Sequence, residues 1–275
     1  QKNLLTLGFD VGKADGFKGA RTRQAIAEFR ALYLPESGKQ LKDADIAVIL
    51  ANYADLARRD AARFGIDHGI VAAIRLSSIR TGVDFSYLMK LAAAESNFEP
   101  KSKSATSSAT GIYQFTRDTW LNTLKTHGTK YGLVGHYAAN IEHYQTVYGY
   151  QRPRVRNEAM YQHLLELRKN PRLSAIMAAE MVRDSEQLLA HSFDRKPTQT
   201  DLYLTHFLGN DDAITFLQSL EQSPNVHALE IFPEAASSNQ NIFHPRSRDP
   251  RTVDEVYAHF GKKFSTRRYD EIAAN

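Results

Sequence analysis

The chain contains no cysteine, a single tryptophan and no long apolar run among its 275 residues. Without cysteine it can form neither a disulfide nor a thiolate metal site, and a cysteine nucleophile is excluded. No apolar run approaches the roughly 20 residues that a membrane-spanning helix needs, so we expect no membrane insertion. The chain opens at Gln1 with no visible targeting segment, which is typical of a processed form or a fragment.

Basic residues are in modest excess and are scattered along the chain. The formal net charge is +4, which favours anionic polymers such as nucleic acid or an anionic cell wall. Because the basic residues do not form blocks, we expect no nucleic-acid partner. The ten histidines show no tight ligand spacing and no His-Glu-x-x-His motif, so we expect neither a metal nor another cofactor.

Helical periodicity dominates the sequence, and no long alternating strand is present, which predicts an all-α fold. Residues 1–58 contain three short helical patterns separated by glycine-rich and proline-containing breaks. A charged and then glycine-containing stretch, residues 60–69, follows them. We therefore predict a small three-helix domain over residues 1–60 and a larger helical domain over residues 66–275.

Glu95 is the strongest candidate for a catalytic residue. It lies in a predicted helix over residues 85–98, three, four and seven residues after Ala92, Leu91 and Leu88. This spacing aligns its carboxylate with the apolar face of the helix. Because an apolar environment disfavours the charged form, we expect a raised pKa, which suits a general acid near neutral pH.

A second motif follows at a fixed distance. Residues 95–98 read Glu-Ser-Asn-Phe, a Ser/Thr/Lys-rich loop covers residues 101–109, and residues 111–115 read Gly-Ile-Tyr-Gln-Phe. Together the two segments resemble the Glu-Ser and Gly-Leu-Met-Gln motifs of lytic transglycosylases. A two-part signal of this kind is much more specific than either half alone.

The resemblance implies a lysozyme-like helical domain with one catalytic carboxylate, Glu95. This group would protonate the bond between N-acetylmuramic acid and N-acetylglucosamine and then deprotonate the muramic 6-hydroxyl. The product would be a 1,6-anhydro sugar, formed without water. The predicted substrate-binding residues are Ser96, Ser107, Ser108, Gly111, Tyr113, Gln114, Phe115, Glu180, Tyr203 and His206.

The residue 203–209 segment departs from the family pattern, and Glu180 lies outside the family motifs. The family's Ala-Tyr-Asn-x-Gly segment is represented by residues 203–209, where His206 takes the place of the usual tyrosine. Tyr203 lies one helical turn earlier, so both side chains are candidates for the cleft. Glu180 lies in an apolar helix and needs a partner there; it is either a structural ion pair or a second cleft carboxylate.

The N-terminal segment resembles the peptidoglycan-binding domain of wall hydrolases. The resemblance rests on Leu-Gly-Phe at residues 7–9, Asp-Gly-Phe-Lys-Gly at residues 15–19 and the helix that begins at Thr22. The family pattern extends upstream of Gln1, so we expect the first helix to be shortened. Joined to the catalytic domain, this segment makes the chain similar to phage endolysins and virion-associated transglycosylases. The implied partner is the glycan strand of peptidoglycan. The enzyme would act on it in the periplasm, outside the cell or after delivery by a phage.

Two alternatives remain open from the sequence. A hydrolytic lysozyme would need a second carboxylate to hold water opposite Glu95, and Glu99 and Glu180 are the candidates. A non-catalytic wall-binding protein could keep the same fold. The tyrosine-rich stretch of residues 128–153 has no clear periodicity. We interpret it as a family-variable insertion that lines the cleft, where its tyrosines would suit stacking on a glycan.

Overall fold

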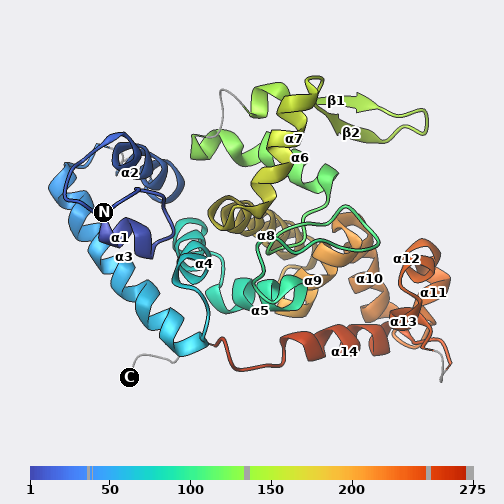
Figure 1. Ribbon diagram of the computed structural model, residues 1–275. Coiled ribbons are helices and arrows are strands. Elements are labelled where there is room, and N and C mark those ends of the chain that lie inside the picture. Colours follow the sequence, from blue (N-terminus) through green and yellow to red (C-terminus); the bar gives the residue numbers. More distant parts are fainter. Residues whose placement is uncertain (36–37, 39, 133–136, 246–248, 271–275) are drawn as a thin grey trace. The chain divides into compact units, whose positions relative to one another are not determined.

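The computed structural model describes residues 1–35, 38, 40–132, 137–245 and 249–270. The regular structure of these residues is almost entirely helical, which confirms the predicted all-α class (Figure 1). They form two compact units, residues 1–181 and residues 182–275, each of which is described here by itself.

The first unit holds eight α-helices, three short 3₁₀ turns and one small hairpin among its described residues. The α-helices are α1 (Lys2–Thr6), α2 (Ala20–Tyr33), α3 (Asp43–Phe64), α4 (His68–Thr81), α5 (Phe85–Ser96), α6 (Arg117–His127), α7 (Glu158–Glu166) and α8 (Pro171–Phe193), which continues into the second unit. The 3₁₀ turns are η2 (Gly128–Tyr131), η3 (Ala138–Asn140) and η4 (Leu167–Lys169), and the strands are β1 (Glu142–Gln145) and β2 (Gln151–Arg154).

The second unit consists of short helices in its described part. They are α9 (Gln199–Leu208), α10 (Asn210–Gln222), α11 (Ala228–Ile231), α12 (Pro233–Ser238), α13 (Gln240–Phe243) and α14 (Val253–Phe264). Helix α14 packs on α9 through aromatic rings, with Tyr203 and Phe264 centroids 5.1 Å apart. None of the described helices combines the length and apolar character that crossing a bilayer requires.

Helices α1, α2 and α3 pack together at the N-terminal end of the chain and are called the N-terminal bundle below. Phe9 and Phe29 meet edge to face inside it, with ring centroids 6.0 Å apart, and both are almost completely buried. Helix α3 does not end within residues 1–58, as predicted, but continues to Phe64, where Gly65 in a left-handed conformation ends it. The Phe64 ring lies 6.0 Å from that of Phe85 on α5, so α3 also packs outside the bundle.

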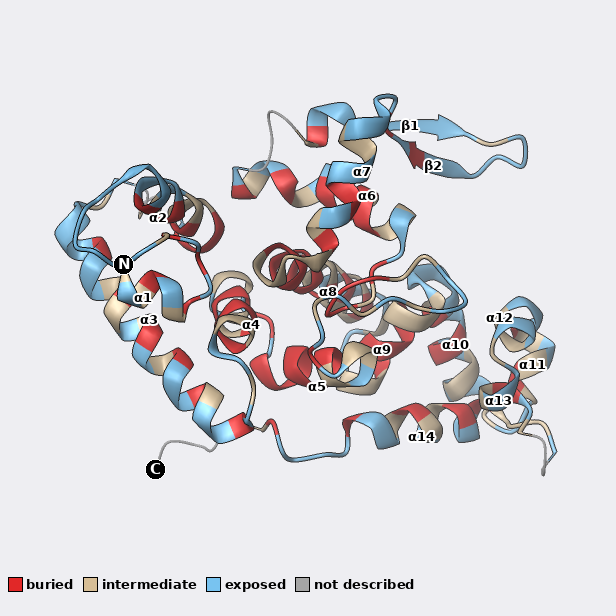
Figure 2. Ribbon diagram, viewed as in Figure 1, coloured by how far each residue is buried: buried red, intermediate tan, exposed pale blue. Residues whose placement is uncertain are grey.

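Helices α4, α5 and α8 contribute much of the hydrophobic core of the first unit (Figure 2). On α5, every residue from Phe85 to Ala92 is buried, which leaves only its last turn partly accessible. On α8, residues 175–179 have no exposed surface. The Glu95 helix is thus a core helix whose C-terminal end alone approaches the surface.

The predicted boundary between residues 60 and 66 remains a prediction. The two compact units divide elsewhere, within α8, and the N-terminal bundle lies in the same unit as the Glu95 helix. Arg75 of α4 makes a two-point ion pair with Asp60 of α3, with N–O distances of 2.8 and 3.1 Å. Close packing across residues 60–75 explains why these segments cluster together.

Candidate active site

Helix α5 presents Glu95 on its last turn. Asp84 caps the start of the helix, where its side chain accepts a hydrogen bond from the Tyr87 amide, and Asn97 caps its end. Asn97 and Phe98 both have positive φ, 51° and 65°, so the chain turns sharply just after the acid. Phe98 is buried and holds this turn against the core, while Glu95 is half-buried. The carboxyl group therefore sits on a rigid support at the edge of the core.

Ser96 connects the end of α5 to the second motif. Its hydroxyl donates a hydrogen bond of 2.8 Å to the carbonyl oxygen of Ile112. This bond spans sixteen residues and places the Glu-Ser and Gly-x-x-Gln segments next to each other. The predicted role of Ser96 in substrate binding remains a prediction, while this contact gives its hydroxyl a structural role.

The second motif is a tight turn rather than the start of a helix. Helix α6 begins only at Arg117, because Gly111 and Gln114 both have positive φ, 88° and 47°. The Gln114 amide nitrogen donates to the carbonyl oxygens of Gly111, at 2.8 Å, and Ser102, at 3.3 Å. These bonds fix the orientation of the Gln114 side chain across the turn.

Arg168 holds the turn by hydrogen bonds to its carbonyl groups, a role that no local motif predicts. One of its terminal nitrogens donates to the carbonyl oxygens of Ser108, at 2.7 Å, and Phe115, at 3.0 Å. Its Nε donates to Leu165, and its side chain is buried. Burial lowers the pKa of the guanidinium below its ordinary value. The two carbonyls lie on either side of the Gly111 turn, so one buried cation clamps both of its ends.

Ser107 and Ser108 lie in the loop before the turn, as predicted. The Ser107 hydroxyl accepts a hydrogen bond from the Ala109 amide, and its side chain is exposed. The Ser108 hydroxyl instead accepts from the Arg117 amide, at 3.2 Å, at the start of α6. Ser107 is therefore the more accessible of the two.

Tyr113 and Phe115 lie in the core, 1% and 2% exposed. The Tyr113 hydroxyl donates to the carbonyl oxygen of Leu88, and burial raises the pKa of this phenol. The Phe115 ring packs edge to face on Trp120, with centroids 5.1 Å apart. Because protein covers both rings, neither presents a face to a sugar.

Glu180 also lies inside the protein, with no exposed surface. Its carboxylate accepts hydrogen bonds from Tyr131 and from Lys130, whose Nζ lies 2.5 Å away. His127 Nδ1 lies 3.8 Å from its other oxygen. The Lys130 ammonium already brings the positive charge that a metal ion would supply. The geometry matches the structural alternative, a buried ion pair, and gives a glycan no access to this group.

Tyr203 and His206 belong to the second unit. Tyr203 is buried, its hydroxyl accepts a hydrogen bond from Lys263 at 2.8 Å, and its ring stacks on that of His206 at 6.0 Å. His206 is half-buried on the same helix, α9. Their predicted part in substrate binding remains a prediction.

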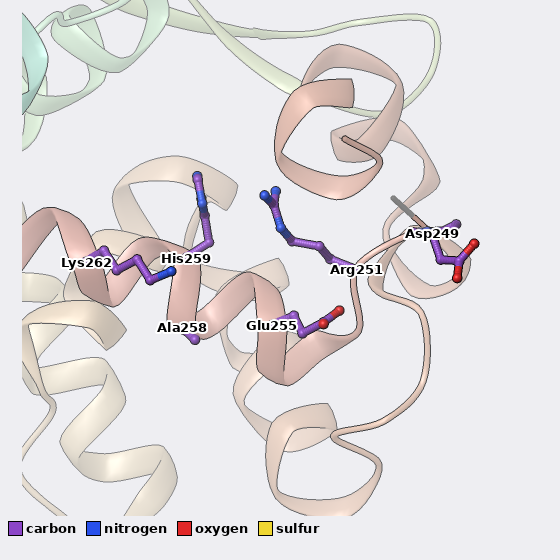
Figure 3. Close-up of a pocket in the computed structure, with 7 residues that line it drawn as sticks. Asp249, Arg251, Glu255, Ala258, His259 and Lys262 are labelled. Atoms are coloured by element: carbon purple, nitrogen blue, oxygen red, sulfur yellow. The ribbon is translucent and has the colours of Figure 1, made fainter. Parts of the chain in front are cut away.

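A pocket of about 450 Å³ lies in the second unit, between the start of α14 and the segment before it (Figure 3). Its lining is polar and of mixed charge, consisting of Asp249, Pro250, Arg251, Glu255, Ala258, His259 and Lys262. It contains none of the predicted site residues. We assign it no part in catalysis.

Residues 72–142 match the sequence model of the family described as the transglycosylase SLT domain. The matched segment includes α5 with Glu95, the turn at residues 111–114 and α6. The chain is therefore an enzyme of the peptidoglycan lytic transglycosylase class, with a lysozyme-like helical fold. An SLT domain acts on peptidoglycan in the cell wall, which favours the enzymatic reading over a non-catalytic wall-binding protein.

Proposed function

We propose that this enzyme cleaves the β-1,4 bond between N-acetylmuramic acid and N-acetylglucosamine without water, with Glu95 as its single general acid and base. The observation that carries the proposal is the hydrogen bond from Ser96 to Ile112. It joins the end of the Glu95 helix to the turn that holds Gln114. A carboxyl group and an amide are thereby supported on two rigid, connected elements, as a catalytic site requires.

The reaction needs one carboxyl group used twice. Glu95 gives its proton to the glycosidic oxygen while the bond between that oxygen and the muramic anomeric carbon breaks. The resulting carboxylate then takes the proton of the muramic 6-hydroxyl, whose oxygen bonds to the anomeric carbon. The carboxyl group is regenerated, no water is consumed, and the product is a 1,6-anhydro sugar.

Gln114 and Ser107 are the proposed polar contacts to the glycan. Because Gln114 donates to the Gly111 and Ser102 carbonyls, its amide oxygen has a defined direction, and it is suited to accept from an acetamido N–H or a hydroxyl. The exposed Ser107 adds a donor and an acceptor from the neighbouring loop. Gly111 serves this site through its backbone conformation.

A hydrolytic lysozyme is the alternative on the same bond, and it needs a second carboxylate that holds water. Glu180 is enclosed and paired with Lys130 and Tyr131. Glu99 is exposed and accepts a hydrogen bond from the Lys101 amide at 3.0 Å. Neither candidate is arranged to activate a water, which supports the transglycosylase reaction.

We also propose that residues 1–60 bind peptidoglycan and that the chain has the modular organisation of phage-delivered wall enzymes. The Gln1 side chain supports this by ordering the loop before α2; it accepts from the Gly16 amide and donates to the Phe17 carbonyl and to Thr22. Phe17 projects from this ordered loop and is 78% exposed. A fixed loop with an exposed aromatic ring suits a saccharide surface.

The reaction product tests the proposed chemistry. Purified peptidoglycan is digested with the enzyme, and the released muropeptides are weighed by mass spectrometry. Products one water lighter than hydrolysis products carry 1,6-anhydro ends, as we expect. Reducing muramic ends would instead assign the enzyme as a lysozyme.

Glu95→Gln tests the assignment of the acid. We expect this variant to lose at least about 100-fold in wall-lytic rate, because an amide cannot donate and recover the proton. It should still sediment with insoluble peptidoglycan. Glu99→Gln is the matched control, four residues further along the chain, and should retain activity. An active Glu95→Gln enzyme, or an inactive Glu99→Gln enzyme, would refute the single-acid assignment.

A further inference from the structure

A hairpin with an exposed aromatic tip projects from the first unit and has no role in the site described above. Strands β1 and β2 pair antiparallel, with Tyr144 opposite Arg152. The segment at the tip carries Val147, Tyr148 and Tyr150, which are 94%, 84% and 71% exposed. Figure 2 shows the hairpin as mainly exposed, and the SLT match ends at its first residue. Large apolar side chains gathered on one projecting loop are a mark of an interaction surface.

The tip is ordered. The Thr146 amide donates to the Tyr150 carbonyl at 2.8 Å, and the Gly149 amide donates back to Thr146 at 2.9 Å. The Thr146 hydroxyl accepts from the Tyr150 amide at 3.1 Å. Gly149, with φ 86°, makes this tight closure possible. A tip fixed before binding loses little conformational entropy when a ligand covers it.

The base of the hairpin is fastened to α6. Pro153 is buried, and its cross-strand partner His143 hydrogen-bonds the Asn122 side chain at 2.9 Å. Arg152 forms an ion pair with Asp118 of α6, with an N–O distance of 2.9 Å. The exposed rings are therefore held at a fixed place relative to the SLT domain.

By strand alternation, Tyr144 and Tyr150 lie on the same face of the hairpin as diagonal neighbours. Tyr148 lies in the turn between the two strands. Phenol rings offer both an apolar face and a hydroxyl, a combination that suits the faces and hydroxyls of sugar rings. Gln145 and Gln151, both exposed, add amide donors and acceptors at the same end.

The charges of the hairpin argue against an anionic membrane as the partner. Arg154 and Arg156 both pair with Glu142, at 3.5 and 2.8 Å, and Arg152 pairs with Asp118. Binding to acidic lipid relies on basic groups that are available at the surface. The arginines of this hairpin are committed to acidic neighbours, while the tip itself is uncharged.

From these observations we propose that the hairpin tip, Val147, Tyr148 and Tyr150, binds a peptidoglycan glycan strand outside the catalytic site. The proposal rests on the proposed function, since it assumes that the enzyme works on the same polymer. The tip holds an insoluble strand against the SLT domain and adds nothing to bond cleavage itself. Its loss affects insoluble wall more than short soluble fragments.

Tyr148→Ala and Tyr150→Ala test this surface in the full-length chain. In a Glu95→Gln background, each change should weaken sedimentation with insoluble peptidoglycan by about 5- to 10-fold, the effect of losing one aromatic contact. With Glu95 present, cleavage of short soluble peptidoglycan fragments should remain at the wild-type rate. Tyr148→Trp should keep wall binding, because it preserves a stacking ring. Ile79→Ser is the control, since it removes an exposed apolar side chain from α4, outside residues 1–60.

Two results would overturn the proposal. One is wild-type wall binding by both alanine variants. The other is binding of the intact protein to vesicles of anionic phospholipid that the alanine variants lose, which would assign the tip to a membrane. If the wild-type enzyme releases no product from peptidoglycan, the proposed function fails first. If it does release product, and the tip variants bind the wall normally, only the hairpin inference fails.

Discussion

At the scale of single residues, Gly111 is the most constrained position in the site. Its φ of 88° lies in the region that favours glycine, and the Arg168 carbonyl oxygen lies where a Cβ would be. The amide of Gly111 also donates to Ser102 at 2.9 Å. The turn that carries Gln114 therefore depends on having no side chain at residue 111.

Gly111→Ala should both destabilise the protein and reduce activity. We expect a loss of about 2–4 kcal/mol in the free energy of unfolding, from the positive φ together with the clash against backbone. Gly82→Ala is the matched control, because Gly82 has φ 81° but no atom within 4 Å of the added Cβ. It should cost about 1–2 kcal/mol and leave activity unchanged. Urea unfolding and lysis assays measure the stability and the activity of both variants. Equal losses of stability would show that the Arg168 carbonyl does not clash with a Cβ at residue 111.

At the scale of elements, periodicity predicted the helices well and their ends poorly. The Glu95 helix was expected to reach residue 98 but ends at Ser96, because Asn97 adopts a left-handed conformation. Helix α6 does not follow the Gly111 motif directly but starts at Arg117, because Thr116 caps it and the preceding turn has positive φ. The hairpin was not predicted, since strands of four residues give too few alternations to detect.

The candidate site likewise contains residues that local motifs predicted and one that they did not. Glu95, Ser96, Gly111 and Gln114 were found because they lie in two short motifs. Arg168 was missed because it reaches Ser108 across sixty residues, and nothing local marks an arginine that bonds carbonyl groups. Tyr113 looked like a sugar contact by its type alone, since burial is a tertiary property that its motif does not record.

Helix α14 should make the stability of the second unit sensitive to acid. Burial, with Arg251, Lys263 and Lys262 nearby, lowers the pKa of His259 from its ordinary 6.5. The unfolded chain then binds a proton more readily than the folded protein, so this contribution is present above about pH 6.5 and is lost as pH falls. Urea midpoints should drop between pH 7.5 and 5.5, and less so in His259→Gln. Parallel pH dependence in the two proteins would contradict this.

At the scale of the first unit, the N-terminal bundle is joined firmly to α4 and α8. Arg172 of α8 forms an ion pair with Glu28 of α2 at 2.9 Å, donates to the Gly8 carbonyl and covers the Phe9 ring. A Cβ on Gly69 would lie only 3.0 Å from the Gly8 Cα, so the two backbones touch. The proposed wall-binding segment is thus attached without a free linker in the described residues, and a strand bound to it stays in a fixed relation to α5.

This attachment predicts that the bundle and the SLT domain unfold together. The single tryptophan, Trp120, is buried in α6 and reports on the SLT domain by fluorescence. Because the chain has no cysteine, Ala27→Cys on the exposed side of α2 allows one dye to report on the bundle. We expect the two urea transitions to coincide, as two-state unfolding requires. An earlier transition of the α2 dye would show instead that the bundle is an independent domain.

Removing the linking arginine provides the decisive comparison. Arg172→Met should lower both transitions together by about 1–2 kcal/mol, because it leaves the half-buried Glu28 and the Gly8 carbonyl without this donor. Arg58→Met removes an exposed pair with Asp55 on α3 and should cost under about 0.5 kcal/mol. Arg172→Met could instead shift only the transition reported by the α2 dye and leave the Trp120 transition unchanged. That result would show that the bundle and the SLT domain unfold as separate units.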